Sequence, residues 1–419
     1  MIDDTYPPLA AWLYGERVAD LHYDGVRGIH LTYTPSAIDR YGLNGLALSA
    51  SMPVRAEGYA PGASAPYLDR LLPEGSARSL LERRFGVPRG DTFHLLEALG
   101  RDCAGAVIIV DAADRPGVDD VPPQPLSDEE IAGRLEDLPA NPLGVDDRVR
   151  LSLAGMQAKL LLTSTDDGRF ALPTGDAPST HIMKPEAADL PGLSANEAWC
   201  LTLADRAGLP AASAEVLSFG GHETLVVERY DRQRGPDGAL DRIHQEDACQ
   251  ALGTRLPSKY EQDPGGPTLR SIATLLRRIT VDPSTDLDRL AEMVVFTVAI
   301  GNADLHGRNV SLLYTSEGPR LAPVYDAVAT IAYDRVSTGL GMFVGSARDV
   351  MSIGASDVHN ELRSWRLSAH RAQRLTTNTL LRLSDALDVA TTQVPAAEAV
   401  SEMVRTRIDN LLLTAPSGD

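Results

Sequence analysis

Three oxygen-bearing side chains between residues 300 and 330 have a spacing that suits phosphoryl transfer from a nucleotide. Asn309 stands at the fifth position after Asp304, and Asp326 lies further along, after a turn. In protein kinases an aspartate base precedes a metal-binding asparagine by the same interval, and a second aspartate completes the metal site. Hard oxygen ligands of this kind suit magnesium. The spacing therefore predicts Asp304 as the catalytic base and Asn309 and Asp326 as magnesium ligands.

The surrounding sequence favours this interpretation over simple Asx turns, which Asp and Asn also form in loops. An apolar helix runs into Gly301, the polar loop ADLHGRN follows, and two predicted strands, VSLLY and RLAPVYD, bring the chain to Asp326. His306 lies inside the loop as a further candidate for the chemistry. The sequence leaves open whether His306 contacts phosphate or stabilises the loop.

A kinase must also hold ATP, and residues 152–159, SLAGMQAK, are the first candidate segment. Its small residues would let backbone N–H groups approach phosphates. The segment matches neither a Walker A nor a G-x-G-x-x-G loop, so an ordinary β-turn is the alternative. The predicted nucleotide contacts in it are Ser152, Ala154, Gly155, Met156, Gln157 and Lys159.

Further nucleotide contacts are predicted on the strands that follow. Lys184 ends the strand HIMK, from which its ammonium group would reach the α- and β-phosphates, although taken alone it is a lysine beside a proline. Glu197, on the next predicted helix, is a candidate partner for that lysine. The segment LVVERYD places Glu228, Arg229 and Tyr230 where an adenine edge needs backbone hydrogen bonds, although an edge strand and hairpin would also explain it.

The elements that must position these residues predict an α+β fold. Residues 12–34 alternate apolar and polar positions around Asp24-Gly25, as a β-hairpin does. Residues 67–84 are helical in period, AGAVIIV reads as a buried strand, and Ser127 with Glu130 forms a capping-box pattern. From residue 268 the pattern is mostly helical. The predicted segments are an N-terminal subdomain at 1–125, a connector at 126–148, a β-rich lobe at 149–267 and a helical lobe at 268–419.

Composition limits the partners and the compartment. The formal net charge is −19, which argues against direct binding of nucleic acid, because phosphates need Lys and Arg to displace counterions. The three cysteines, Cys103, Cys200 and Cys249, are far apart and form no CxxC pair, which indicates a reducing cytoplasm. The N-terminus lacks the pattern of a signal peptide, and no apolar stretch is long enough to span a bilayer, so no membrane association is expected.

Taken in order, these segments resemble the HipA kinases of bacterial type II toxin–antitoxin systems over nearly the whole chain. YLDRLLPEG and LGRDCAGAVIIV are similar to that family's N-terminal subdomain. The kinase part is similar in SLAGMQAK, HIMKPE, NEAWCLTLADRAGL, VVERYDR, RIHQEDACQALG, KYEQDPGGP, GNADLHGRN and LAPVYD. Two residues depart from that family's usual pattern: Ala158 stands where a Glu is frequent, and Met156 where a smaller residue is common. The resemblance implies a two-lobed kinase-like fold with an extra N-terminal subdomain.

The resemblance also implies a function. It implies an ATP- and Mg²⁺-dependent serine/threonine kinase that inhibits growth by phosphorylating a translation component such as an aminoacyl-tRNA synthetase. Ser152 falls where family members carry an autophosphorylated serine, and a helix-turn-helix antitoxin would provide any contact with DNA. The alternatives are a catalytically silent corepressor, which would tolerate loss of Asp304, Asn309, Lys184 or Asp326, and a small-molecule kinase.

Overall fold

The structure is a computed structural model that describes residues 6–26, 28–117, 123–144, 158–173, 177–235 and 240–414. Contacts divide the chain into two compact units. The first unit consists of Met1–Pro185 and Ser218–Glu246, and the second of Glu186–Leu217 and Asp247–Asp419. The four predicted segments with their boundaries stay predictions, because this division is coarser.

The first unit begins with an antiparallel sheet in the order β3-β2-β1-β4. The predicted hairpin around Asp24 is confirmed: Tyr23 pairs with Ile29, and the Asp24 carboxylate accepts hydrogen bonds from the N–H groups of Val26 and Gly28, at 2.8 and 2.7 Å. Alternate residues of β3 are buried, as a half-buried strand requires. The elements are β1 (Leu9–Leu13), β2 (Glu16–Tyr23), β3 (Ile29–Tyr33), α1 (Pro35–Tyr41), α2 (Pro61–Leu68), α3 (Gly75–Arg84), α4 (Thr92–Leu99) and β4 (Ile108–Asp111).

The helical period over residues 67–84 is interrupted. Helix α2 and a short 3₁₀ turn, Asp69–Leu71, end before Pro73, and α3 begins at Gly75. Leu72 is extended, with φ −99° and ψ 156°, because a residue that precedes proline is sterically driven out of the helical region. Two short helices therefore replace one long helix.

A second sheet in the first unit carries the predicted lysine strand. The order β6-β5-β7-β9 places β7 between β5 and β9, with Lys184 opposite Leu225. The predicted capping box of α5 is confirmed at Ser127 and Glu130. The elements are α5 (Asp128–Asp137), β5 (Leu160–Ser164), β6 (Phe170–Ala171), β7 (His181–Pro185), β9 (His222–Glu228), β10 (Arg232–Arg234) and β11 (Leu240–Arg242); β8 (Ala214–Phe219) and β12 (His244–Asp247) cross the boundary between the units.

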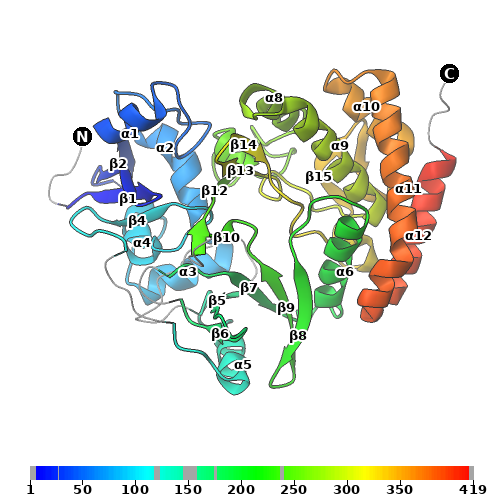
Figure 1. Cartoon of the computed structure of the whole chain (residues 1–419), viewed down its shortest axis with the longest axis horizontal. Helices are drawn as coiled ribbons and strands as arrows, with labels where there is room; N and C mark the ends of the chain where they lie inside the picture. Colours follow the sequence, from blue (N-terminus) through cyan, green and yellow to red (C-terminus); the bar gives the residue numbers. More distant parts are fainter. Residues whose placement is uncertain are drawn as a thin grey trace. The chain divides into compact units, whose positions relative to one another are not determined.

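The second unit is mainly helical, as predicted. Helix α11 packs against α6, α9 and α12, and these helices run beside one another in Figure 1. Every residue of α9 from Met293 to Ile300 is buried, which is the pattern of a core helix. The elements are α6 (Leu193–Arg206), α7 (Ala248–Ala251), α8 (Leu269–Ile279), α9 (Pro283–Ile300), β13 (Ser311–Thr315), β14 (Gly318–Leu321), β15 (Gly339–Val344), β16 (Ala347–Asp349), α10 (Ala355–Ser364), α11 (Ala369–Gln393) and α12 (Glu398–Leu413).

The predicted path from α9 to Asp326 needs one correction. Helix α9 ends at Gly301 in the left-handed conformation, with φ 70°, as a C-terminal glycine allows. Strands β13 and β14 then form the predicted hairpin. The second strand ends at Leu321 and not at Asp326, because the chain leaves the ladder and Val324 instead bridges to Ala211. Asp326 therefore stands in a loop.

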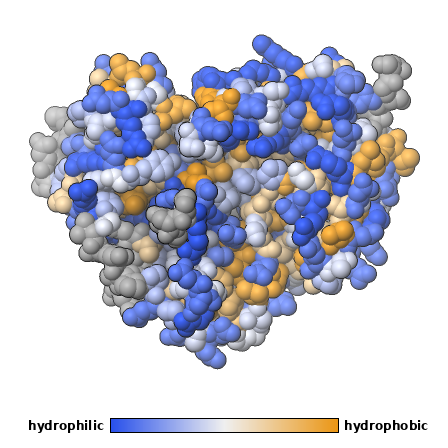
Figure 2. Space-filling view, in the orientation of Figure 1, coloured by the Kyte–Doolittle hydropathy of each residue, from blue (hydrophilic) through white to orange (hydrophobic). Residues whose placement is uncertain are grey.

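The face of the molecule drawn in Figure 2 is mainly hydrophilic where it is coloured. In Figure 2 apolar residues form scattered groups between larger polar areas. In the part of the chain that the structure describes, no helix combines the length and apolar character needed to cross a membrane.

Gly341 offers a test of how β15 holds the loop after α9. Its N–H donates to the carbonyl of Ala303 at 2.7 Å, and a Cβ atom there would lie 2.6 Å from the carbonyl oxygen of Leu305. We expect Gly341→Ala to lower the free energy of unfolding by about 1–3 kcal/mol, because the loop backbone must move. Urea denaturation measures the loss. Gly339→Ala on the same strand is the control, since its Cβ would meet only the Ser337 hydroxyl, at 3.4 Å. Equal losses in both variants would contradict this account.

Candidate active site

The loop between α9 and β13 holds Asp304 at the surface. Within residues 301–310, only Asp304 is exposed, and its neighbours are buried. The N–H of Asp304 donates to the Asn302 side-chain oxygen at 2.8 Å, which forms an Asx turn. The Thr330 hydroxyl accepts from the N–H of Ala303 at 2.8 Å and donates to the carbonyl of Gly301 at 3.0 Å. The backbone is thus fixed on both sides of the helix end while one carboxylate projects.

Two residues of a second segment, Lys259 and Tyr260, interact with the Asp304 carboxylate. The Tyr260 hydroxyl donates to Oδ1 of Asp304 at 3.2 Å. Enclosure by protein atoms raises the pKa of Asp304, although the positive charge of Lys259 and the Tyr260 hydrogen bond oppose the rise, and the negative charge of Asp326 adds to it. A carboxylate with a raised pKa is a better proton acceptor.

Asn309 and Asp326 lie together beside Asp304. The amide nitrogen of Asn309 is 3.4 Å from Oδ2 of Asp326 and 3.5 Å from the backbone carbonyl of Asp304. Rotation of the amide by half a turn exchanges its nitrogen and oxygen, which would present two oxygens to a cation. Magnesium is commonly bound by one or two protein oxygens together with phosphates and water, so this pair fits the ion.

The backbone of Asp326 is held in an uncommon conformation. Its φ is 52°, in the left-handed region that residues other than glycine seldom adopt, and the residue is exposed. Asp is among the residues that tolerate this region best, and such conformations cluster at functional sites. The geometry therefore directs a carboxylate outward at a small conformational cost.

Side chains beneath the loop fix its second half. The Tyr325 hydroxyl donates to the carbonyl of Arg308 at 2.5 Å and shares a hydrogen bond with the Ser311 hydroxyl at 2.6 Å. The Arg308 guanidinium contacts the Asp247 carboxylate at 3.2 Å. Tyr325, the residue before Asp326, is thus hydrogen-bonded to both sides of Asn309.

His306 faces inward. The residue is buried, and its ring meets the edge of Tyr260 with the centroids 5.2 Å apart. Burial, helped by the positive charge of Lys259, lowers the pKa of His306 to about 4, so the ring is neutral at pH 7. These contacts describe a residue that supports Tyr260. The predicted participation of His306 in the chemistry stays a prediction.

The remaining predicted nucleotide contacts belong to the first unit. Lys159 and Lys184 are both buried, just before β5 and on β7. Glu228 is exposed at the end of β9, and Tyr230 follows it. Ser152, Ala154, Gly155, Met156 and Gln157 lie outside the residues that the structure describes.

The side chain of Arg229 is held inside the first unit. It is buried, its guanidinium bonds to Asp231 at 2.8 Å and to the carbonyl of Cys103 at 3.0 Å, and the backbone N–H of Arg229 donates to the carbonyl of Thr180 at 2.8 Å. These contacts give the side chain a place in the interior, and the predicted contact of Arg229 with the nucleotide stays a prediction. The sequence did offer a signal for buried charges here, because charged residues stand next to apolar ones in the strings RDCAGAV and VVERYDR.

Sequence reasoning also missed Tyr260 and Lys259 as neighbours of the base. They lie more than forty positions before Asp304 in the sequence. Their segment, KYEQDPGGP, carries part of the family resemblance, which was the only indication of its importance.

Comparison with known proteins places this geometry in a family. The model of the HipA-like C-terminal domain matches residues 151–409, and that of the HipA N-terminal domain matches residues 9–110. The chain is 41% identical over 346 residues to a Sinorhizobium fredii protein named putative kinase Y4mE, covering 81% of each. It is 32% identical over 324 residues to the serine/threonine-protein kinase toxin HipA of Shewanella oneidensis, covering 74% of this chain and 73% of that one.

A solved structure agrees with the sequence matches. The structure of the Shewanella oneidensis MR-1 toxin–antitoxin system HipA, HipB and its operator DNA complex contains a chain with a TM-score of 0.83 to this one. The two are 26% identical, and the match covers 96% of this chain and 99% of the other. The predicted α+β, two-lobed kinase-like fold with an extra N-terminal subdomain is confirmed by this likeness, as is the family resemblance.

Proposed function

This chain belongs to the HipA family of protein kinases, and from that premise we propose that it transfers the γ-phosphoryl group of ATP to a serine or threonine hydroxyl. The arrangement of Asp304, Asn309 and Asp326 at the end of α9 is the observation that carries the proposal. It supplies a projecting base beside two oxygen ligands, and phosphoryl transfer asks for little more from a protein than positioning and charge stabilisation.

Asp304 acts as the base in the proposed reaction. Tyr260 occupies Oδ1, so Oδ2 is the atom that we expect to receive the proton of the attacking hydroxyl. As the hydroxyl oxygen bonds to the γ-phosphorus, the bond from that phosphorus to the β–γ bridging oxygen breaks, and ADP leaves. Asn309 and Asp326 would hold magnesium; when bound, the ion neutralises charge on the β- and γ-phosphates.

The first unit supplies the other proposed contacts to ATP. Lys184 would bind the α- and β-phosphates, with Lys159 and the loop at 152–157 beside them, and the segment at Glu228 and Tyr230 would bind the adenine edge. A buried lysine suits this role, because its ammonium group acts more strongly where water is scarce.

Two substitutions separate the role of the base from that of the metal ligand. We expect Asp304→Asn to lower turnover by at least about a hundredfold and to keep Mg–ATP affinity, because the amide has the same shape and cannot take the proton. Asp326→Ala should instead weaken Mg–ATP binding at least about tenfold. Turnover and calorimetry measure the two effects, with the exposed Asp385→Asn as control. Retained turnover in Asp304→Asn would remove it as the base, and unchanged affinity in Asp326→Ala would remove it as a ligand.

The substrate that we propose is a component of translation, such as an aminoacyl-tRNA synthetase, whose phosphorylation would stop growth. The relative from Shewanella oneidensis is named a toxin, which supports this reading. Labelled ATP added to a cell lysate with wild type or Asp304→Asn identifies proteins labelled only by the active enzyme. Labelling confined to small molecules would instead favour a small-molecule kinase, and no transfer at all would favour a silent corepressor.

We further propose that phosphorylation of Ser152 switches the enzyme off. The residue lies outside the described part of the chain, so the proposal is based on family resemblance and charge. A phosphate adds about −1.5 to −2 charges in a loop proposed to hold the anionic phosphates of ATP, and like charges repel.

Mass spectrometry after incubation with Mg–ATP tests the switch. Phosphate should appear on Ser152 in wild type and not in Asp304→Asn, and the phosphorylated fraction should bind ATP poorly. An active enzyme with unmodified Ser152, or full ATP affinity after phosphorylation, would refute it.

A helix-turn-helix antitoxin is the proposed partner for any contact with DNA. The related HipA of known structure is in a complex with HipB and operator DNA, and this chain carries a net charge of −19. We expect the isolated protein to leave operator DNA unshifted in a gel at physiological salt, and a basic partner to restore the shift. Tight sequence-specific retention by the isolated chain would overturn the proposal.

A further inference from the structure

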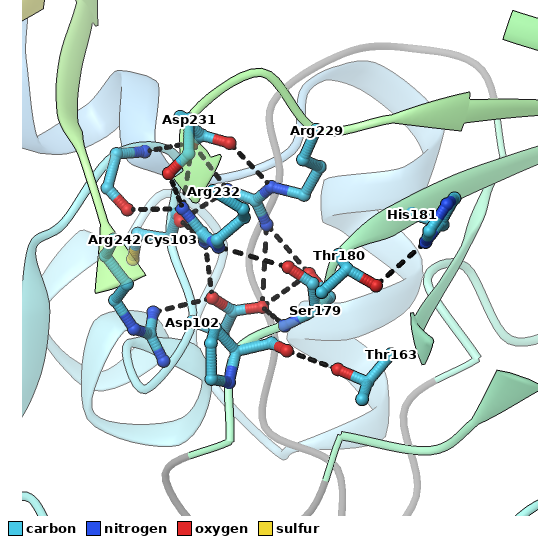
Figure 3. Close-up of polar contacts among 12 residues, drawn as sticks. Asp102, Cys103, Thr163, Ser179, Thr180, His181, Arg229, Asp231, Arg232 and Arg242 are labelled. Carbon is cyan, nitrogen blue, oxygen red and sulfur yellow. Dashed lines mark hydrogen bonds and ion pairs between the residues drawn. The ribbon is translucent and has the colours of Figure 1, made fainter. Parts of the chain in front are cut away.

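The interior of the first unit contains a compact group of charged side chains that the proposed chemistry does not use. Two carboxylates and three guanidiniums meet there, and at most 10% of any of these side chains is exposed (Figure 3). We call this group the buried ion network; its members are Asp102, Arg229, Asp231, Arg232 and Arg242.

Asp102 joins three separate segments of the chain. Its Oδ1 accepts from Arg232 at 2.8 Å and from Arg242 at 2.6 Å. Its Oδ2 accepts from the N–H and the hydroxyl of Ser179, at 2.9 and 2.6 Å, and lies 3.5 Å from Arg229. Burial alone would raise the pKa of Asp102, but the three guanidiniums and Ser179 outweigh it and lower the pKa to about 2. The carboxylate is therefore charged at neutral pH.

Asp231 forms the second centre of the network. It accepts from the Arg229 guanidinium at 3.0 and 2.8 Å and from the N–H of Gly105 at 2.7 Å. Gln245 donates to the same carboxylate at 3.1 Å, and its side-chain oxygen accepts from the hydroxyl of Tyr230. Tyr230, a predicted adenine contact, is thereby tied to the network through one residue.

Backbone carbonyls accept further hydrogen bonds from the guanidinium groups of the network. The carbonyl of Cys103 accepts from Arg229 and Arg232 at 3.0 and 3.3 Å, and that of Gly105 accepts from Arg232 at 2.9 Å. The loop at residues 102–105 is therefore bound at three points by the segment at residues 229–232. A Cβ atom on Gly105 would lie 2.5 Å from the backbone nitrogen of Gln245, so this loop also lies close against β12.

A purely stabilising function explains this arrangement poorly. Burying ions costs several kcal/mol each, and apolar residues of similar volume often stabilise a protein as well or better. What such a network supplies is a fixed geometry, since every charged atom must meet its partner at a set distance. Here the geometry is imposed on residues 229–232, directly after Glu228 and around Tyr230, and on Ser179, which precedes the Lys184 strand β7.

We propose that the buried ion network positions the nucleotide-binding segment, and that Asp102 makes the N-terminal family domain part of the ATP site. Asp102 lies within the region matched by the HipA N-terminal domain, residues 9–110, whereas Arg229, Asp231 and Arg232 lie within the region matched by the C-terminal domain, residues 151–409. The inference rests on the proposed use of Glu228 and Tyr230 for adenine. Asp102 is a positioning residue, because it acts through Arg229 and Arg232.

Two variants of the full chain test the proposal. Asp102→Asn keeps the shape of the Asp102 side chain and removes its negative charge. Arg242→Gln removes one positive partner of the same carboxylate, at the most exposed member of the network. We expect the KM for ATP to rise by about tenfold in Asp102→Asn and by a smaller factor in Arg242→Gln, with kcat within about twofold of wild type. Amide hydrogen exchange over residues 228–232 should become faster in both. The control is Asp388→Asn, which breaks an exposed ion pair with Arg405 and should change neither quantity.

The measurements are made at a temperature where circular dichroism shows each variant folded. A merely structural role would lower the melting temperature and leave the KM for ATP and the local exchange unchanged, which would overturn the proposal. If Asp102→Asn does not fold, the KM for ATP and the amide hydrogen exchange of Arg242→Gln test the proposal instead. Failure of wild type to turn over ATP would contradict the proposed function itself. An active wild type with unaltered KM in a folded variant would contradict only the role of the network.

Discussion

The position of one carboxylate, that of Asp304, is the constraint on which the second unit is organised. In the proposed reaction the oxygen of Asp304 must meet the substrate hydroxyl, so the loop that carries Asp304 must be held in place. Helix α9 is buried along its last eight residues and ends at a left-handed Gly301, which fixes where the loop begins. Thr330, Tyr325 and the close approach of β15 at Gly341 then fix the loop from three sides.

The same principle operates in the first unit with different chemistry. There the segment proposed to bind the nucleotide is held by buried charges instead of an apolar helix. Asp102 meets guanidiniums that lie more than a hundred residues further along the sequence, and Asp231 accepts from the equally distant N–H of Gly105. In each unit buried polar groups hold a few residues that the proposals invoke, and much of the remaining core is aliphatic, with aromatic side chains such as Phe93 and Trp199 among its largest members.

The net charge and the site are consistent with one another. The chain carries a net charge of −19, and the positive groups that the proposals invoke, Lys159, Lys184 and the arginines of the network, are buried. Buried cations act locally and are little screened by salt. This distribution of charge is consistent with the proposed nucleotide site and with the proposal that a partner makes any contact with DNA.

The sequence alone predicted the chemistry, because the interval between Asp304 and Asn309 and the turn signals around them are local properties of the chain. Local signals also predicted the hairpin at Asp24, the capping box at Ser127 and the glycine end of α9. Only the tertiary structure decided that β14 stops at Leu321, that Tyr260 contacts the base, and that Arg229 points inward to Asp102. These outcomes depend on which distant segments pack together and on where a charge can find a partner when water is excluded, and no local pattern of residues encodes that choice.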